Sequence, residues 1–133
     1  MDERVKAAVR ELTAALEEER AAFPDAVQAL IEAGADVNQL DGRGQAPLAG
    51  VAFKGLIDVA AALVKAGAAI DARSADGRTP LMMAAAFNRG EMVRWLVERG
   101  ASTDARDAAG LSALDIARAM GAHDAAGILS RGA

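Results

Sequence analysis

The sequence repeats itself every 33 residues, and this period limits the fold more strongly than any other feature of the chain. Gly34, Gly67 and Gly100 lie one period apart. Four further columns keep the same spacing: Gly44, Gly77 and Gly110; Leu48, Leu81 and Leu114; Leu30, Leu63, Leu96 and Leu129; and the acids Asp25, Asp58, Glu91 and Asp124. A unit of this length cannot bury a hydrophobic face alone, so the units must stack in a linear array.

Signals inside the third unit predict a turn followed by a short helix. Asp76-Gly77 marks the turn, Thr79 is a natural N-cap, and Pro80 suits the first position of a helix. The apolar run over 81–87 is long enough for a short buried helix. We expect Asn88 to end this helix, because asparagine tolerates the left-handed backbone conformation and glycine stands at the same phase in two other units.

A second helix is expected in each unit. In the third unit Glu91 places a negative charge at the start of this helix, where the macrodipole favours it. An apolar stripe over 92–97 gives the helix one buried face, and Gly100 ends it. Trp95 belongs to this stripe, and packing between units is preferred for it over a binding role.

Alanine dominates the apolar part of the composition. The chain has 133 residues, of which 53% are hydrophobic, 35 are alanine and only 3% are aromatic. Large apolar side chains are too few for a thick core, whereas alanine favours helix and lets helices approach closely. The chain is therefore expected to form one all-α domain of thin, closely packed helix layers.

The charge balance and the lack of cysteine exclude several classes of function. Lys and Arg number 15 against 19 Asp and Glu, which gives a formal net charge of −4. An acidic chain with few aromatic rings lacks the positive field and the stacking surfaces that nucleic acids need. No apolar run is long enough to cross a membrane, and residues 1–20 do not resemble a signal peptide. We expect a cytoplasmic protein, with a periplasmic protein whose leader has been removed as the alternative.

The third unit carries the residues of a known repeat. Its first half, 76–85, has the sequence DGRTPLMMAA, and its second half, 92–101, has the sequence MVRWLVERGA. These segments resemble the ankyrin repeat, whose period is also 33 residues. The resemblance recurs over 44–68 and, more weakly, over 107–129, and it covers roughly 21–131 in all. It implies an all-α helix-turn-helix solenoid of about four units, of which the first is degenerate.

The resemblance also divides the single domain into parts. These are an N-terminal capping helix over 1–22, a partial repeat over 23–40, repeats over 41–73 and 74–106, and a C-terminal capping repeat over 107–133. Ala49, Met82 and Asp115 replace the histidine of the family's Thr-Pro-Leu-His motif, so we expect its bonds between neighbouring turns to be lost and the turns to be less rigid. Ala46 replaces the Thr N-cap of the second unit, which costs about 1 kcal/mol.

No group of residues predicts catalysis or metal binding. Ser112, Asp115, His123 and Asp124 have the residue types of a hydrolase triad. Nothing supplies the oxyanion site that a triad requires, and Ser112 is better explained as an N-cap. A single histidine, no cysteine and one acid per unit do not converge on a metal ion. We expect no enzyme activity, no cofactor and no metal.

The resemblance further implies where a partner binds, since ankyrin-like solenoids usually hold a protein on the concave face made by the turn tips and the first helices. On this face Phe53, Phe87 and Met120 stand at the ends of the first helices, and arginines stand at the turn tips. Half-buried packing is the alternative interpretation of the two phenylalanines. The predicted partner-binding residues are Leu40, Arg43, Phe53, Lys54, Arg73, Asp76, Arg78, Phe87, Arg106, Leu111 and Met120.

We therefore predict a protein-protein interaction module that binds one specific protein partner through its concave groove and turn tips, without catalytic activity. The surface suits a partner segment with acidic and apolar residues. We expect a monomer when unbound and no nucleic-acid or membrane partner. Alanine and arginine richness points to a bacterial source. Small bacterial proteins of this kind resemble both immunity or antitoxin proteins that inhibit a toxic enzyme and accessory scaffolds for a stress-response enzyme.

Overall fold

A computed structural model describes residues 37–131 apart from 39, 41 and 43. The predicted capping helix over 1–22 and most of the partial repeat over 23–40 lie outside the described residues. The described part of the chain holds six helices and no strand. These helices are α3 (Pro47–Lys54), α4 (Ile57–Lys65), α5 (Pro80–Ala86), α6 (Gly90–Glu98), α7 (Ala113–Ala119) and α8 (His123–Arg131).

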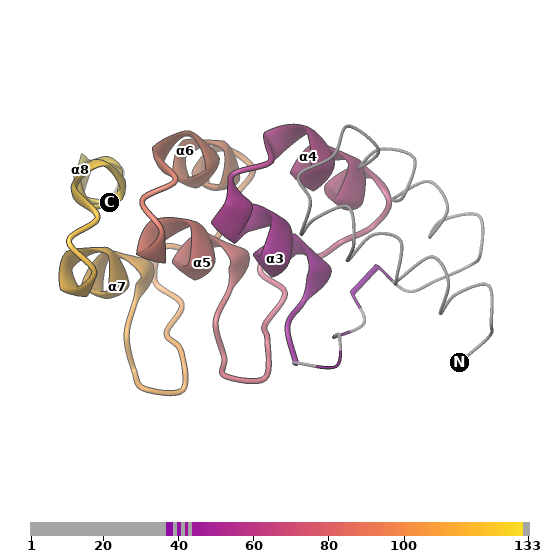
Figure 1. Ribbon diagram of the computed structural model, residues 1–133, viewed down its shortest axis with the longest axis horizontal. Coiled ribbons are helices and arrows are strands. Elements are labelled where there is room, and N and C mark those ends of the chain that lie inside the picture. Colours follow the sequence, from indigo (N-terminus) through magenta and orange to yellow (C-terminus); the bar gives the residue numbers. More distant parts are fainter. Residues whose placement is uncertain (1–36, 39, 41, 43, 132–133) are drawn as a thin grey trace.

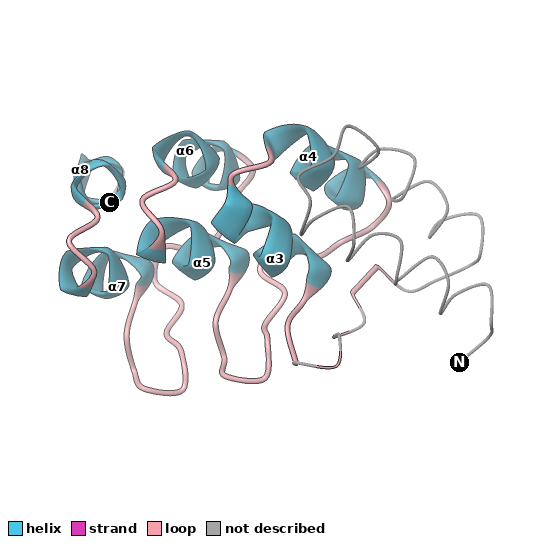
Figure 2. Ribbon diagram, viewed as in Figure 1, coloured by secondary structure: helices cyan, strands magenta, loops and turns pink. Residues whose placement is uncertain are grey.

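The helices form three pairs that stack side by side. The first helices α3, α5 and α7 make one row, with α5 packed between α3 and α7 (Figure 1). Each second helix, α4, α6 or α8, packs against the first helix of its own pair, on the side away from the long turns. The turns before α5 and α7 project in the same direction, as the pink loops in Figure 2 show. The predicted all-α solenoid is confirmed.

The first helices begin as the sequence predicts. The Thr79 hydroxyl accepts a hydrogen bond from the Met82 amide, and Pro80 opens α5. Ser112 makes the same bond with the Asp115 amide at the start of α7. Ala46 makes no side-chain capping bond at the start of α3. Two of the three described first helices therefore have the cap that their sequence predicts, and the third lacks it.

The ends of the first helices confirm the special role of one asparagine. Asn88 has a φ of 56°, the only positive φ of a described residue other than glycine. Gly55 and Gly121, one unit before and one unit after, have φ values of 74° and 69°. The Asn88 side chain also accepts the backbone N–H of Ala125 at 3.0 Å, so it ties the end of its own first helix to the start of α8 in the next unit.

The leucine columns build the core. Leu48 and Leu81 from the first helices are 1% and 0% exposed, and Leu63, Leu96 and Leu129 from the second helices are 0%, 0% and 3% exposed. Alanine fills most of the remaining core positions, which lets the short helices lie close together. The core is thin and runs the length of the described array because each unit buries its neighbour's apolar face.

The position of the family's missing histidine is filled in three different ways. In α5 the Thr79 amide donates to the Met82 sulfur at 3.4 Å, and in α7 the Ser112 amide donates to the Asp115 carboxylate at 3.1 Å. In front of α3, where Ala49 has no polar group, the Ala46 amide donates to Ser74 Oγ of the following unit at 3.0 Å. Each amide therefore keeps a partner without the histidine.

Candidate partner-binding surface

The turns that precede the first helices are bonded to one another in series. The Ala75 amide donates to the Gly44 carbonyl at 2.7 Å, and the Ala108 amide donates to the Asp76 carbonyl at 3.1 Å. Gly77 is required at the second contact, because its φ is 79° and a Cβ there would lie 2.9 Å from the Ala108 nitrogen. Backbone hydrogen bonds therefore join neighbouring turns although the family's histidine is absent.

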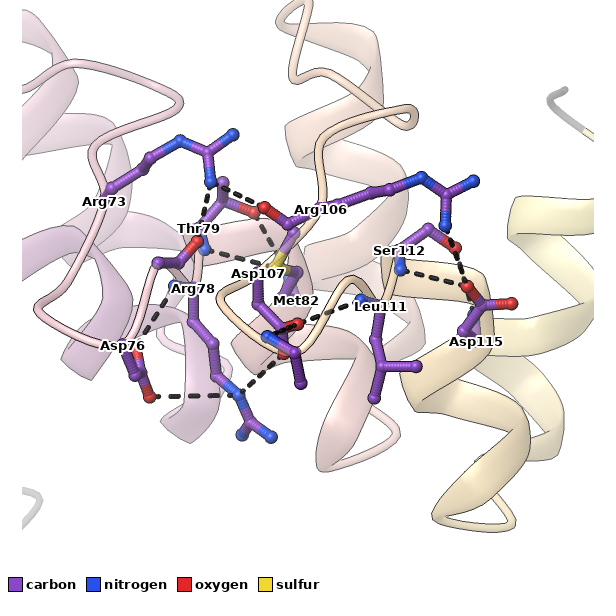
Figure 3. A network of polar contacts seen from close by, with 12 residues as sticks. Arg73, Asp76, Arg78, Thr79, Met82, Arg106, Asp107, Leu111, Ser112 and Asp115 are labelled. Atoms are coloured by element: carbon purple, nitrogen blue, oxygen red, sulfur yellow. Dashed lines mark hydrogen bonds and ion pairs between the residues drawn. The ribbon is translucent and has the colours of Figure 1, made fainter.

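Two predicted binding arginines hold the turns in shape (Figure 3). Arg73 Nη1 donates to the Gly77 carbonyl of its own turn at 2.9 Å and to the Arg106 carbonyl of the next turn at 2.7 Å. Arg106 repeats the first bond with the Gly110 carbonyl at 2.9 Å and lies 3.5 Å from an oxygen of Asp115. Both guanidinium groups remain exposed at the surface, but part of their hydrogen-bonding capacity is used inside the molecule.

The third arginine of the turn tips is paired with acids. Arg78 Nε lies 3.9 Å from Asp76 Oδ2 and 3.7 Å from Asp107 Oδ2. Asp107 is 5% exposed at its side chain, and its Oδ1 accepts the amides of Ala109 and Leu111, each at 2.9 Å. The predicted site did not include Asp107. The signal for it was present, because it opens the Asp-x-x-Gly turn at 107–110.

We call these residues the turn rim: Arg73, Asp76, Arg78, Arg106, Asp107, Leu111 and Asp115. Its three arginines are balanced by three aspartates, so the described rim carries no net formal charge. The pKa of Asp115 is lowered from its usual value, chiefly by the backbone hydrogen bond from Ser112 and then by the Ser112 side chain and the charges of Arg106 and Arg118. The rim is therefore less basic than its arginines alone suggest.

The ends of the first helices form a second, more apolar part of the predicted site. The rings of Phe53 and Phe87 lie 5.1 Å apart between centroids at an interplanar angle of 55°, and Lys54 Nζ lies 5.5 Å from the Phe53 centroid. Phe53 is half-buried, whereas Phe87 is 48% exposed and Met120, one unit further on, is 60% exposed. We call Phe53, Lys54, Phe87 and Met120 the helix-end stripe.

A cation from the next unit supports this stripe. Arg89 Nε donates to the Phe53 carbonyl at 2.8 Å, and the Arg89 side chain lies over Gly55, where a Cβ would approach it to 3.3 Å. Arg89 was not among the predicted site residues, since its position between the two helices of the unit gives no signal for binding. With Lys54 it places two positive charges beside Phe53.

The remaining predicted residues are exposed or fall outside the described part. Leu40 and Leu111 are 39% and 37% exposed in the segments that precede α3 and α7. Arg43 lies outside the described residues. Four large hydrophobic residues are exposed in the described part of the chain, and all four belong to the predicted set: Leu40, Phe87, Leu111 and Met120.

The residues considered for catalysis have structural roles. Ser112 and Asp115 cap α7 reciprocally, and Asp124 lies in the first turn of α8, where it accepts a 3.5 Å hydrogen bond from Asn88 Nδ2. No group of three or more His, Cys, Asp or Glu residues that could hold a metal ion occurs within the described ranges. Among the described helices, none has the length and apolar character needed to cross a bilayer.

Stacked helix pairs and turns bonded in series define a helical repeat protein. Residues 12–107 and 71–133 match the family model described as ankyrin repeats in three copies. The chain therefore belongs to the ankyrin repeat family. Members of this family are generally protein-protein interaction modules and typically not enzymes. No curated protein gives a significant match to the chain.

Proposed function

We propose that this protein binds one specific protein partner on the concave side of the solenoid, with the helix-end stripe as the main anchor and the turn rim beside it. The exposure of Leu40, Phe87, Leu111 and Met120 carries this proposal. Large apolar side chains at the surface are costly for a free protein unless a partner covers them. All four lie at turn tips or at helix ends rather than on the second helices.

The charges beside the stripe indicate the chemistry of the partner. Lys54 and Arg89 lie next to Phe53, whereas the arginines of the turn rim are balanced by aspartates. A partner segment with an apolar anchor and neighbouring carboxylates fits this arrangement, since the apolar part covers Phe87 and the carboxylates meet the two cations. The helix-end stripe therefore makes the main contacts with the partner, and the turn rim holds the neighbouring turns in position.

The test is capture of a partner from the source organism with the wild-type protein and with Phe87→Ser and Met120→Ser variants. We expect one protein to be captured by the wild type and its affinity to fall about tenfold or more in each variant, as for a central apolar contact. An activity assay of that partner then separates an inhibitor from a scaffold, because only an inhibitor silences it.

Arg94→Ser is the matched control. Arg94 is an exposed residue of α6, in the row of second helices, away from the turns. It should bind the partner as the wild type does. Equal binding by the wild type and both stripe variants would place the partner on another face, and loss of binding in the Arg94 variant alone would move the site to the second helices.

A further inference from the structure

The last described unit presents a surface that the two preceding units cover. Leu48 and Leu81 are fully buried because α5 packs on α3 and α7 packs on α5. Leu114 occupies the same column in α7 and is only half-buried. Ala126 in α8 is likewise half-buried, whereas Ala60 and Val93 in its column are 0% exposed. The outer side of α7 and α8 thus corresponds to the surfaces that form the internal interfaces, and no described residue packs over it.

A hydrogen-bond acceptor repeats along this interface. Asn38 Oδ1 accepts the Ala69 amide of the next unit at 2.7 Å. One period later, Asp71 Oδ1 accepts the Ser102 amide at 2.9 Å. Asp104 stands at the third position of this column, exposed, with no hydrogen bond or ion pair to any residue of the described part. Its carboxylate stands at the position where Asn38 and Asp71 accept a backbone N–H, but no described residue donates to it.

A hollow of about 420 Å³ lies at this place. Its lining combines the free acceptor with apolar side chains and comprises Thr103, Asp104, Arg106, Ser112, Leu114 and Leu129. We call Asp104, Leu114, Arg118 and Ala126 together with this hollow the end face. The hollow is large enough for a few residues of a polypeptide and too open for a small ligand to be enclosed.

Two substitutions make the end face different from the internal interfaces. Ala52 and Ala85 are fully buried against the following unit, but Arg118 in their column is exposed and shares one side of α7 with Leu114, four residues before it. Asp115 holds the Arg106 guanidinium, whereas Arg73 holds the carbonyl of the next turn. Arg118 therefore places a cation at a position that is a buried alanine in the two preceding units.

We propose that the end face is a second polypeptide-binding site, which takes a turn segment of a protein. The segment donates a backbone N–H to Asp104, lays an apolar side chain on Leu114 and brings a carboxylate to Arg118. The two internal interfaces show the first contact with Ala69 and Ser102, and Arg118 adds the requirement for an acid. This site does not depend on the helix-end stripe, since it shares none of its residues.

The probe is a head-to-tail cyclised peptide with the sequence of residues 101–111, the segment that covers the same surface one unit earlier. That segment supplies the Ser102 amide to Asp71, the Arg106 carbonyl to Arg73 and the Ala108 amide to Asp76, and it carries two aspartates. Titration into the isotope-labelled full chain should shift the NMR signals around Asp104, Leu114 and Leu129, with saturation in roughly the millimolar range.

Paired variants decide the assignment. Asp104→Leu should weaken peptide binding about tenfold or more, whereas Asp104→Asn should keep it, because Asn38 makes the same bond with an amide oxygen. Arg118→Glu should weaken it through charge repulsion, and Phe87→Ser should leave it unchanged. No saturable shift below about 10 mM peptide, equal binding by Asp104→Leu, or shifts centred on Phe87 would overturn the proposal.

Sedimentation of the free protein tests the other occupant. If the protein remains monomeric at high concentration, the end face does not bind a second copy of this chain, in agreement with the proposal that it binds a different protein. A dimer that dissociates when Arg118 is changed to Glu would assign the end face to a second copy of this chain and would also overturn the proposal.

Discussion

The turn rim and the helix-end stripe both belong to the first helices and the segments that flank them, but their side chains make different contacts. On the rim, Arg73, Arg78 and Arg106 bond to carbonyls or pair with aspartates. On the stripe, Phe87 and Met120 leave about half of their surface or more open to solvent. The polar groups of the turn rim hold the turns in place through internal hydrogen bonds and ion pairs, whereas the helix-end stripe exposes apolar surface that a partner can contact.

This difference separates two effects that a binding assay alone would mix. A change on the rim alters the geometry of the turns and lowers stability, so any loss of binding follows indirectly. A change on the stripe removes contact area and leaves the array folded. Substitutions on the turn rim should therefore lower the stability of the fold more than they lower binding directly. Substitutions on the helix-end stripe should lower binding more than stability.

The largest loss of stability is expected for Asp107→Ala. The side chain is 5% exposed and accepts the amides of Ala109 and Leu111, so its removal leaves two N–H groups without their partner. We expect the free energy of unfolding to fall by about 2 to 3 kcal/mol, measured by urea denaturation. Asp76→Ala is the control, because that side chain is 62% exposed, and its cost should stay below about 1 kcal/mol.

The next largest effect is expected for Arg73→Gln. This change removes the bond to the Gly77 carbonyl within the same turn and the bond to the Arg106 carbonyl, which joins this turn to the next. We expect a loss of about 1 to 2 kcal/mol in urea denaturation, together with faster amide hydrogen exchange at Gly77 and Ala108. If stability were unchanged, the rim would have no structural role and Arg73 would be free for a partner.

Phe87→Ser should change stability less than either rim variant. Phe87 is 48% exposed, and its ring centroid lies 5.1 Å from that of Phe53. A loss of about 1 kcal/mol or less is expected, because the deleted surface is half solvated already. A loss above that of Asp107→Ala would mean that the ring is a core residue and that the stripe is not a binding surface.

The smallest effect concerns pH. The pKa of Asp115 is lowered in the folded protein, chiefly by the Ser112 backbone hydrogen bond, so the folded state favours the charged carboxylate. This contribution is complete above the unfolded-state pKa near 3.9 and is lost as the pH falls through the lower folded-state pKa. The urea concentration at the unfolding midpoint should fall between about pH 6 and about pH 3 in the wild type, and this fall should be smaller in Asp115→Asn. An unchanged difference would remove Asp115 from the acid response.

The sequence predicted the parts of the fold that depend on local signals. Thr79, Pro80 and Ser112 begin helices, and Asn88 ends one, because capping and left-handed backbone follow from residue type over a few neighbouring positions. The exposure of Phe87 and Met120 was also predicted, since the phase within the repeat identifies the side of the helix.

Several contacts that the sequence did not predict join residues far apart in the chain. Arg73 reaches a carbonyl 33 residues away, and Arg89 reaches one 36 residues away. Residue type alone does not show that a side chain bonds a distant backbone carbonyl, so Arg73 was assigned to a partner and Arg89 was given no role. The Met82 sulfur as an acceptor for Thr79 was missed for a related reason, because a methionine at an apolar position normally indicates packing.

Most backbone amides that bond across a unit boundary in the described part of the chain donate in one direction, and Ala46, which donates to Ser74 of the following unit, is the exception. The amides of Ala69, Ala75, Ser102, Ala108 and Ala125 each donate to an acceptor in the preceding unit. On a ribosome, where the chain emerges from its N-terminal end, every new unit would therefore meet acceptors that are already fixed in place. For these five amides the order of synthesis and the direction of the bond agree, whereas the Ala46 amide and the Arg73 guanidinium gain their acceptors only when the following unit has been made.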